Sequence, residues 1–185
     1  MRLTTSRSQA RGHESSAKSV SALQRGTRDC EQVAAVCYRV RSASIEFLLV
    51  RTRRGRWTFP KGGIEPRLTR AQAASIEAFE EAGVHGQIEQ VAFARYRHCK
   101  RGDMREPVVV HVYLCEVLRL DAPQEPDRSR TWFCPEKAKW HLREARAHDP
   151  GEEVAGVVDR AVARIQRLRS LVKPRKLERR PFSGK

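Results

Sequence analysis

Three glutamates in one short stretch are the strongest chemical signal in the sequence. The stretch FPKGGIEPRLTRAQAASIEAFEEAGV, residues 59–84, contains Glu77, Glu80 and Glu81. Residues three and four apart are neighbours on a helix, so the three carboxylates would project toward one side. They would repel one another unless a cation lay between them, and hard oxygen ligands suit Mg²⁺ or Mn²⁺. The stretch therefore predicts a divalent-metal site, with a solvated acidic face as the alternative.

The residues around the glutamates indicate phosphate chemistry. The preceding loop contains Lys61, Gly62 and Gly63. Glycines permit the backbone to approach a phosphate closely, and a lysine can neutralise its charge. Small residues on the opposite half of the expected helix would let it pack closely against a sheet and fix the carboxylates in place. These small residues are Ala73, Ala74, Ala78 and Ala82.

The elements expected to position these residues alternate between strands and helices. The glutamate helix should run from about residue 70 to 82, because Thr69 and Gln72 have the spacing of a capping box and Gly83 suits a left-handed C-terminal position. Two further helices are expected, one from Pro135 to about residue 145 and one after Pro150. Runs rich in Val, Ile, Phe and Tyr predict strands at 32–40, 45–52, 88–97, 108–118 and 131–134. This order predicts a single α/β layered domain with a mixed sheet.

The ends of the chain differ in composition from its middle. Residues 1–29 are rich in Ser and Arg without a sustained apolar period, so we expect a disordered basic tail, with an organelle transit peptide as the alternative. Residues 173–185 form a second basic tail, which leaves 30–172 as the domain. No apolar run approaches the roughly 20 residues that span a bilayer. Five cysteines without a CxxC pair favour free thiols, and we expect a soluble cytoplasmic protein.

The charge of the chain favours an anionic partner. Lys and Arg number 37 against 22 Asp and Glu, a formal net charge of +15. Weak electrostatic contact between nucleic acid and the basic tails is compatible with this excess. A dedicated nucleic-acid-binding protein is disfavoured, because aromatic residues make up only 6% of the chain and no helix-turn-helix, zinc-finger or RNA-recognition motif is present.

The glutamate stretch resembles the box of the Nudix hydrolases, G-x5-E-x7-R-E-U-x-E-E-x-G-U, where U is aliphatic. The box departs from its pattern at two positions, where Leu68 replaces its first Glu and Ile76 its Arg. The resemblance extends over residues 33–163 and implies a Nudix-like α/β/α sandwich. The segments AAVCYR, RWTFPKGGIEP, EEAGV and RTWFCPEKA are most similar to the diphosphoinositol polyphosphate and diadenosine polyphosphate branch. The positions that match the box are Gly62, Glu77, Ala78, Glu80, Glu81, Gly83 and Val84.

The resemblance implies a pyrophosphohydrolase in which water attacks phosphorus. Glu77, Glu80, Glu81 and Gly62 would hold Mg²⁺ or Mn²⁺, and Glu77 or Glu81 would accept the proton of the water. The excess of arginines suggests a substrate with several phosphates, such as a dinucleoside polyphosphate, an inositol pyrophosphate or inorganic polyphosphate. A 5′-triphosphorylated RNA end is an alternative substrate. The expected substrate-binding residues are Lys61, Gly62, Gly63, Arg39, Arg51, Arg53, Arg56, Arg97 and Arg130.

The two departures from the box allow two interpretations. If Leu68 and Ile76 meet, an apolar contact has replaced a salt bridge, an exchange that is often neutral or stabilising. The alternative is a weak or inactive Nudix-like module that binds nucleic acid or polyphosphate. In either case we expect a monomer or a homodimer.

Overall fold

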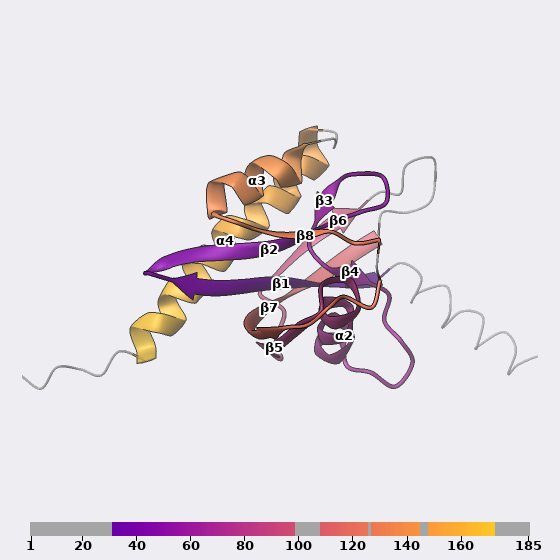
Figure 1. Ribbon diagram of the computed structural model, residues 1–185, viewed down its shortest axis with the longest axis horizontal. Helices are drawn as coiled ribbons and strands as arrows, with labels where there is room; N and C mark the ends of the chain where they lie inside the picture. Colours follow the sequence, from indigo (N-terminus) through magenta and orange to yellow (C-terminus); the bar gives the residue numbers. More distant parts are fainter. Residues whose placement is uncertain (1–30, 99–107, 126, 145–147, 173–185) are drawn as a thin grey trace, which may run out of the picture.

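The computed structural model describes residues 31–98, 108–125, 127–144 and 148–172, which form one sheet covered by helices on both faces (Figure 1). The predicted tails, 1–29 and 173–185, lie outside the described residues, as do Cys30 and Cys99. The strands are β1 (Glu31–Arg41), β2 (Ser44–Arg51), β3 (Trp57–Thr58), β4 (Lys61–Gly62), β5 (Val84–Ile88), β6 (Ala94–His98), β7 (Val108–Leu120) and β8 (Arg130–Phe133). The helices are α2 (Arg70–Ala82), α3 (Pro135–Arg143) and α4 (His148–Val172).

The sheet is mixed, as the sequence predicts. Its main path runs β3-β2-β1-β7-β5, while β4 pairs with β1, β6 with β7 and β8 with β2. The long central strands β1 and β7 run parallel, from the pair Glu31 and Val109 to the pair Tyr38 and Glu116. The other strand pairs are antiparallel.

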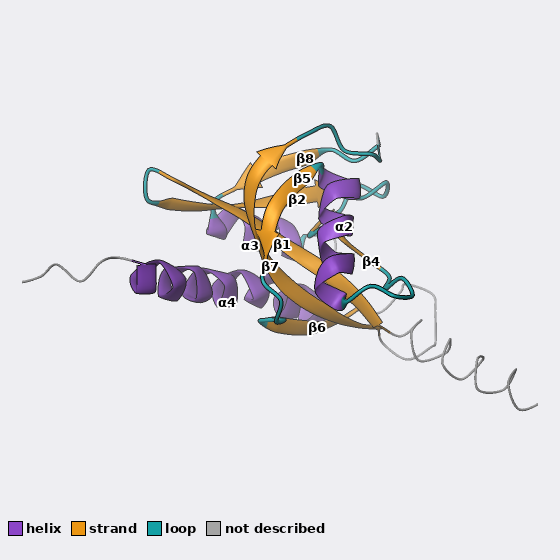
Figure 2. Cartoon of the chain, turned by 90° about the horizontal axis from the view of Figure 1, so that it is seen from below, coloured by secondary structure: helices purple, strands orange, loops and turns teal. Residues whose placement is uncertain are grey.

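Two apolar clusters lie on opposite faces of this sheet. The first joins α3 and α4 to alternate residues of the central strands, with Phe47, Leu142 and Ile165 among its fully buried side chains. The second lies under α2, where Ala74 and Ala78 pack against Val33. Figure 2 shows α2 on one side of the sheet and α3 and α4 on the other. The expected α/β/α sandwich is therefore confirmed.

Helix α2 begins and ends where its local sequence predicts. The Thr69 hydroxyl accepts a hydrogen bond from the Gln72 N–H, and the Gln72 side chain accepts one from the Thr69 N–H. Gly83 adopts the left-handed conformation with φ of 59°, and its N–H donates to Phe79 O. Both ends of the helix that carries the glutamates are thus fixed by side chains and backbone within the same short stretch.

The predicted strand at 88–97 is wrong. Ile88 ends β5, which begins directly after the helix at Val84, and β6 begins only at Ala94. The two short strands pair with successive parts of β7, and the segment 89–93 joins them. The apolar run predicted one strand because each half has strand-like composition, whereas the break depends on the shared partner. The predicted third helix also begins earlier, at His148.

Cys37, Cys115 and Cys134 are free thiols, and Cys37 and Cys115 are buried side by side on β1 and β7. Among the helices that the structure describes, none combines the length and apolar character needed to cross a membrane.

Candidate functional site

The carboxylate of Glu77 lies against the backbone of β4. A Cβ atom placed on Gly62 would come within 1.7 Å of Glu77 Oε1, so glycine alone leaves room for this carboxylate. Burial is the main cause that raises the pKa of Glu77 to about 7, and the neighbouring charges of Glu81, Glu80 and Glu125 raise it further. The loop glycine and the helix glutamate therefore form a cradle in which a carboxylate, crowded by others, would gain from a cation.

Glu81 is the deepest of the three glutamates, with only 3% of its surface exposed. Its Oε2 accepts a hydrogen bond from the Lys61 N–H at 3.2 Å. Its Oε1 lies 2.6 Å from the guanidinium of Arg128. Burial raises the pKa of Glu81, while the charges of Arg128 and Lys61 act in the opposite direction. Both carboxylate oxygens of Glu81 are thus held, one by the backbone of β4 and the other by Arg128.

Glu80 connects the helix to a distant loop. Its side chain is half-buried, and its backbone carbonyl accepts a hydrogen bond from the Glu125 N–H at 3.0 Å. This contact brings Glu125 beside Glu77 and Glu81. Sequence reasoning missed Glu125, because it lies in an irregular segment between β7 and β8 and belongs to no motif.

A basic recess of about 590 Å³ opens beside Glu81. It is lined mainly by cationic side chains from the β2–β3 connection and from the segment before β8. The lining residues are Thr52, Arg53, Arg54, Arg56, Lys61, Glu81, Glu125 and Arg128. The structure therefore brings Lys61, Arg53 and Arg56 together beside Glu81.

The other four arginines predicted to bind substrate have different surroundings. Arg39 stacks over Trp132 at 4.0 Å and pairs with Glu46 at 2.7 Å. Arg51 donates to the carbonyl of Gly55. None of Arg39, Arg51, Arg97 and Arg130 is among the described residues that line the basic recess.

Arg130 secures the C-terminal end of helix α2. Its guanidinium donates to the carbonyl of Asp121 at 2.5 Å and to the carbonyl of Ala82. Carbonyls at the end of a helix lack partners within the helix, and a guanidinium satisfies them well. In this structure Arg130 therefore supports the helix that carries the glutamates.

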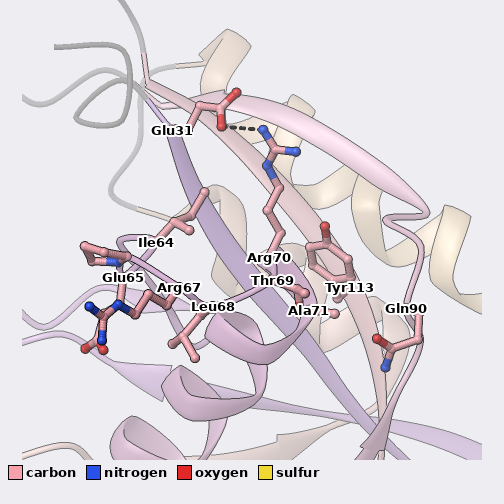
Figure 3. Close-up of a pocket in the computed structure, with 11 residues that line it drawn as sticks. Glu31, Ile64, Glu65, Arg67, Leu68, Thr69, Arg70, Ala71, Gln90 and Tyr113 are labelled. Carbon is pink, nitrogen blue, oxygen red and sulfur yellow. Dashed lines mark hydrogen bonds and ion pairs between the residues drawn. The ribbon is translucent and has the colours of Figure 1, made fainter. Parts of the chain in front are cut away.

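Leu68 and Ile76 occupy different apolar environments. Leu68 packs with Ile64 against the cluster under α2 and lines a recess of about 610 Å³ at the start of that helix, where Arg70 pairs with Glu31 at 2.7 Å (Figure 3). Ile76 lines a separate recess with Phe79 and exposed Leu118. Their positions give no support to a direct apolar contact in place of a salt bridge.

The donor set suits a hard cation in its chemistry, since it consists of carboxylate oxygens next to a glycine cradle. In the part of the chain that the structure describes, however, no three His, Cys, Asp or Glu side chains are arranged so that they could hold a metal ion as they stand. One reason is visible in the contacts of Glu81, whose Oε1 faces Arg128. The residues therefore fit the cation, provided that the ion pair of Glu81 rearranges.

Comparisons with known proteins agree with this fold. Residues 31–154 match the family described as the NUDIX domain. Nudix hydrolase 17, mitochondrial, from Arabidopsis thaliana is 32% identical over 111 residues, which cover 56% of this chain and 60% of that protein. The chain thus matches less than two thirds of the length of that relative.

Two solved structures have the same fold as this chain. The Caenorhabditis elegans Ap4A hydrolase in a binary complex has a TM-score of 0.58 and 22% identity, covering 74% of this chain and 98% of that one. The NUDIX domain of Shewanella oneidensis NrtR complexed with ADP ribose has a TM-score of 0.56 and 19% identity, covering 73% and 87%. Identities at this level show the fold alone. The family match over most of the chain, together with the glutamate helix and its glycine cradle, shows that the chain belongs to the Nudix family.

Proposed function

We propose that this protein is a divalent-cation-dependent pyrophosphohydrolase that acts on a substrate with a chain of several phosphates. One observation carries the proposal: Glu77, whose carboxylate lies in the cradle at Gly62 of β4, is on the same helix as buried Glu81, which lines the basic recess. A site for a cation and a site for a polyanion therefore adjoin. A cation next to a bound phosphate chain can withdraw charge from the attacked phosphorus and activate a water.

The glutamates and the loop would have different roles in the reaction. Glu77, Glu80, Glu81 and the backbone at Gly62 would hold Mg²⁺ or Mn²⁺, which supplies charge withdrawal from phosphorus and a lower pKa for the attacking water. Glu77 or Glu81 would take up the proton of that water. Lys61 would keep Glu81 in orientation through its N–H.

The basic recess supports a substrate recognised by its phosphates. Arginine binds phosphate oxygens in a bidentate manner, and Arg53, Arg54 and Arg56 lie together there. The described lining includes no aromatic side chain on which a base could stack. Trp57, which follows this arginine-rich segment, packs edge-on against Phe133 with ring centroids 5.1 Å apart. Dinucleoside polyphosphates, inositol pyrophosphates and inorganic polyphosphate are the proposed substrate class.

The similar structures are consistent with ligands that contain a phosphoric anhydride. One is an Ap4A hydrolase, and the other is complexed with ADP ribose. A 5′-triphosphorylated RNA end shares this chemistry and stays an alternative substrate. The cytoplasmic location, the choice between monomer and homodimer, and weak contact of the tails with nucleic acid remain predictions.

Substrate profiling tests the proposal directly. Purified protein would be incubated with Mg²⁺ or Mn²⁺ and with diadenosine polyphosphates, inositol pyrophosphates, nucleoside diphosphate sugars, polyphosphate and triphosphorylated RNA. We expect release of phosphate or nucleotide from at least one of the longer polyphosphates. Glu80→Gln and Glu81→Gln should each abolish that release. Absence of cleavage across the whole panel would eliminate the enzyme proposal, and full activity in both variants would eliminate the site assignment.

The alternative is a Nudix-fold module that binds polyanions without cleaving them. The observation that favours it is the ion pair between Glu81 and Arg128, which engages a carboxylate that the reaction needs. Tight, salt-sensitive binding of polyphosphate without any cleavage in the same panel would support this alternative.

A further inference from the structure

Arg128 bridges two carboxylates at the edge of the basic recess. Its Nη2 lies 2.6 Å from Glu81 Oε1, and its Nε lies 2.7 Å from Glu125 Oε2. The Glu81 side chain is 4% exposed, whereas the Arg128 and Glu125 side chains are 18% and 41% exposed. Arg128 thus connects the deepest acid of the site with an acid at its surface.

This bridge has a consequence for the carboxylate of Glu81. Lys61 N–H is bonded to one of its oxygens and Arg128 to the other. A guanidinium stays protonated in proteins, so its charge cannot be removed by the loss of a proton. A divalent cation and Arg128 therefore compete for Glu81 Oε1, through both position and charge.

Arg128 has two alternative partners if it leaves Glu81, namely Glu125 and a phosphate chain in the basic recess. Its second contact, with Glu125, can persist because it uses a different nitrogen. Its side chain also lines the basic recess with Arg53, Arg54 and Arg56, where a phosphate chain would offer new oxygens.

We propose that Arg128 is an internal counter-ion of Glu81, displaced when a divalent cation is bound and then free to bind the phosphate chain. The inference rests on the proposed function and names the side chain that couples its two ligands. Phosphate that draws Arg128 away from Glu81 would favour cation binding, and by linkage the cation would favour phosphate binding to the same degree. Arg128 is thus a positioning residue as well as a phosphate contact.

The first test measures Mn²⁺ binding to the full chain without substrate, by electron paramagnetic resonance of free Mn²⁺. Arg128→Met removes the competitor, and we expect its Kd for Mn²⁺ to fall by about fivefold to tenfold, within the usual range of coupling between sites. Arg70→Met is the matched control, because Arg70 also pairs with a glutamate at 2.7 Å but lies at the other end of α2. Its Kd for Mn²⁺ should stay near that of the wild type.

Arg128→Lys keeps the test valid if Arg128→Met does not fold. A lysine retains the charge but donates from a single nitrogen, so it cannot bridge both carboxylates in the same way. We expect its Kd for Mn²⁺ to lie between those of wild type and Arg128→Met. Unchanged or weaker Mn²⁺ binding in every Arg128 variant that folds would overturn the inference.

The second test measures the coupling itself. The Kd for free Mn²⁺ would be determined with and without methylenediphosphonate, which has no hydrolysable P–O–P bond, after correction for complexes in solution. In the wild type the analogue should tighten Mn²⁺ binding, and in Arg128→Met this effect should shrink toward none. Equal coupling in both proteins would overturn the inference.

Glu81→Gln separates the failure of this inference from that of the proposed function. If Glu81→Gln binds Mn²⁺ as the wild type does, Glu81 is not a cation ligand, and the proposed site and this inference both fail. If Glu81→Gln weakens Mn²⁺ binding but the Arg128 variants do not tighten it, the inference alone fails.

Discussion

Glu77 Oε1 lies where a side chain on Gly62 would have to be, at 1.7 Å from the position of a Cβ atom. Gly62→Ala should therefore push the carboxylate out of its cradle and lower kcat/KM by about 100-fold, the scale of a misplacement by an ångström. Gly63→Ala is the matched control, because a Cβ there meets no atom within 4 Å. Steady-state kinetics and Mn²⁺ titration would check this prediction, with unchanged Mn²⁺ affinity expected for Gly63→Ala. Equal Mn²⁺ affinities in the two variants would contradict the cradle.

The raised pKa of Glu77 predicts how the stability of the protein depends on pH when a chelator keeps it free of divalent cations. Its folded pKa of about 7 lies above the ordinary value of a glutamate, so the folded protein binds more protons than the unfolded chain between these two values. Stability should fall as the pH rises from about 4.5 to about 7 and then stay low. Glu77→Gln should remove this loss and stabilise the protein at pH 8 by about 2 kcal/mol, after allowance for partial exposure.

Thermal unfolding at pH 4, 6 and 8 would measure this effect. The difference between Glu77→Gln and wild type should be small at pH 4 and largest at pH 8. Glu65→Gln, at an exposed glutamate in the loop before α2, serves as the control. A difference that does not vary with pH would show that Glu77 titrates near its ordinary value.

Leu68 and Ile76 should contribute independently to stability. Ile76 lies two helical turns beyond the cap, a rise of about 10 Å along the axis, which is far for two aliphatic side chains to bridge. Leu68→Ala should cost about 1–2 kcal/mol through lost packing under α2, and Ile76→Ala less than about 1 kcal/mol because Ile76 lies in a separate recess outside that cluster. Chemical denaturation of both single variants and the double variant should give additivity within about 0.5 kcal/mol. A larger coupling energy would show that the two side chains meet after all.

Removal of the Arg130 side-chain charge should lower stability, whereas removal of the Arg56 charge should weaken substrate binding. Arg130 donates to two carbonyls at the end of α2, so Arg130→Met should lower stability by about 2 kcal/mol, or the midpoint of thermal unfolding by about 5 °C. Arg56 lines the basic recess, so Arg56→Met should raise KM for a polyphosphate with little change in stability. Calorimetry and kinetics on both variants would check this, and a raised KM in Arg130→Met without destabilisation would restore its role in substrate binding.

Local sequence signals predicted helix α2, whereas the break between β5 and β6 and the position of Glu125 depend on tertiary contacts. The bounds of α2 followed from Thr69, Gln72 and Gly83, whose interactions lie within the stretch itself. The break between β5 and β6 depends on how both pair with β7, and a composition rule cannot detect it. Glu125 could not be predicted for the same reason, since tertiary contacts bring it to the glutamates, among them its hydrogen bond to Glu80 O and its ion pair with Arg128. The basic recess was predicted in part, because Arg53 and Arg56 are close in sequence to Lys61.

The segment between β7 and β8, together with Arg130 at the start of β8, is attached to the C-terminal end of α2 at several points. Asp121 N–H donates to Gly83 O, Glu125 N–H donates to Glu80 O, and Arg130 donates to Ala82 O. A protein engineer who grafts this loop from another family member, in order to change specificity, would therefore also exchange the groups that hold the end of the helix. The loop and the end of helix α2 form a single structural unit. Proteins in which both are exchanged together should fold more often than proteins in which the loop alone is exchanged.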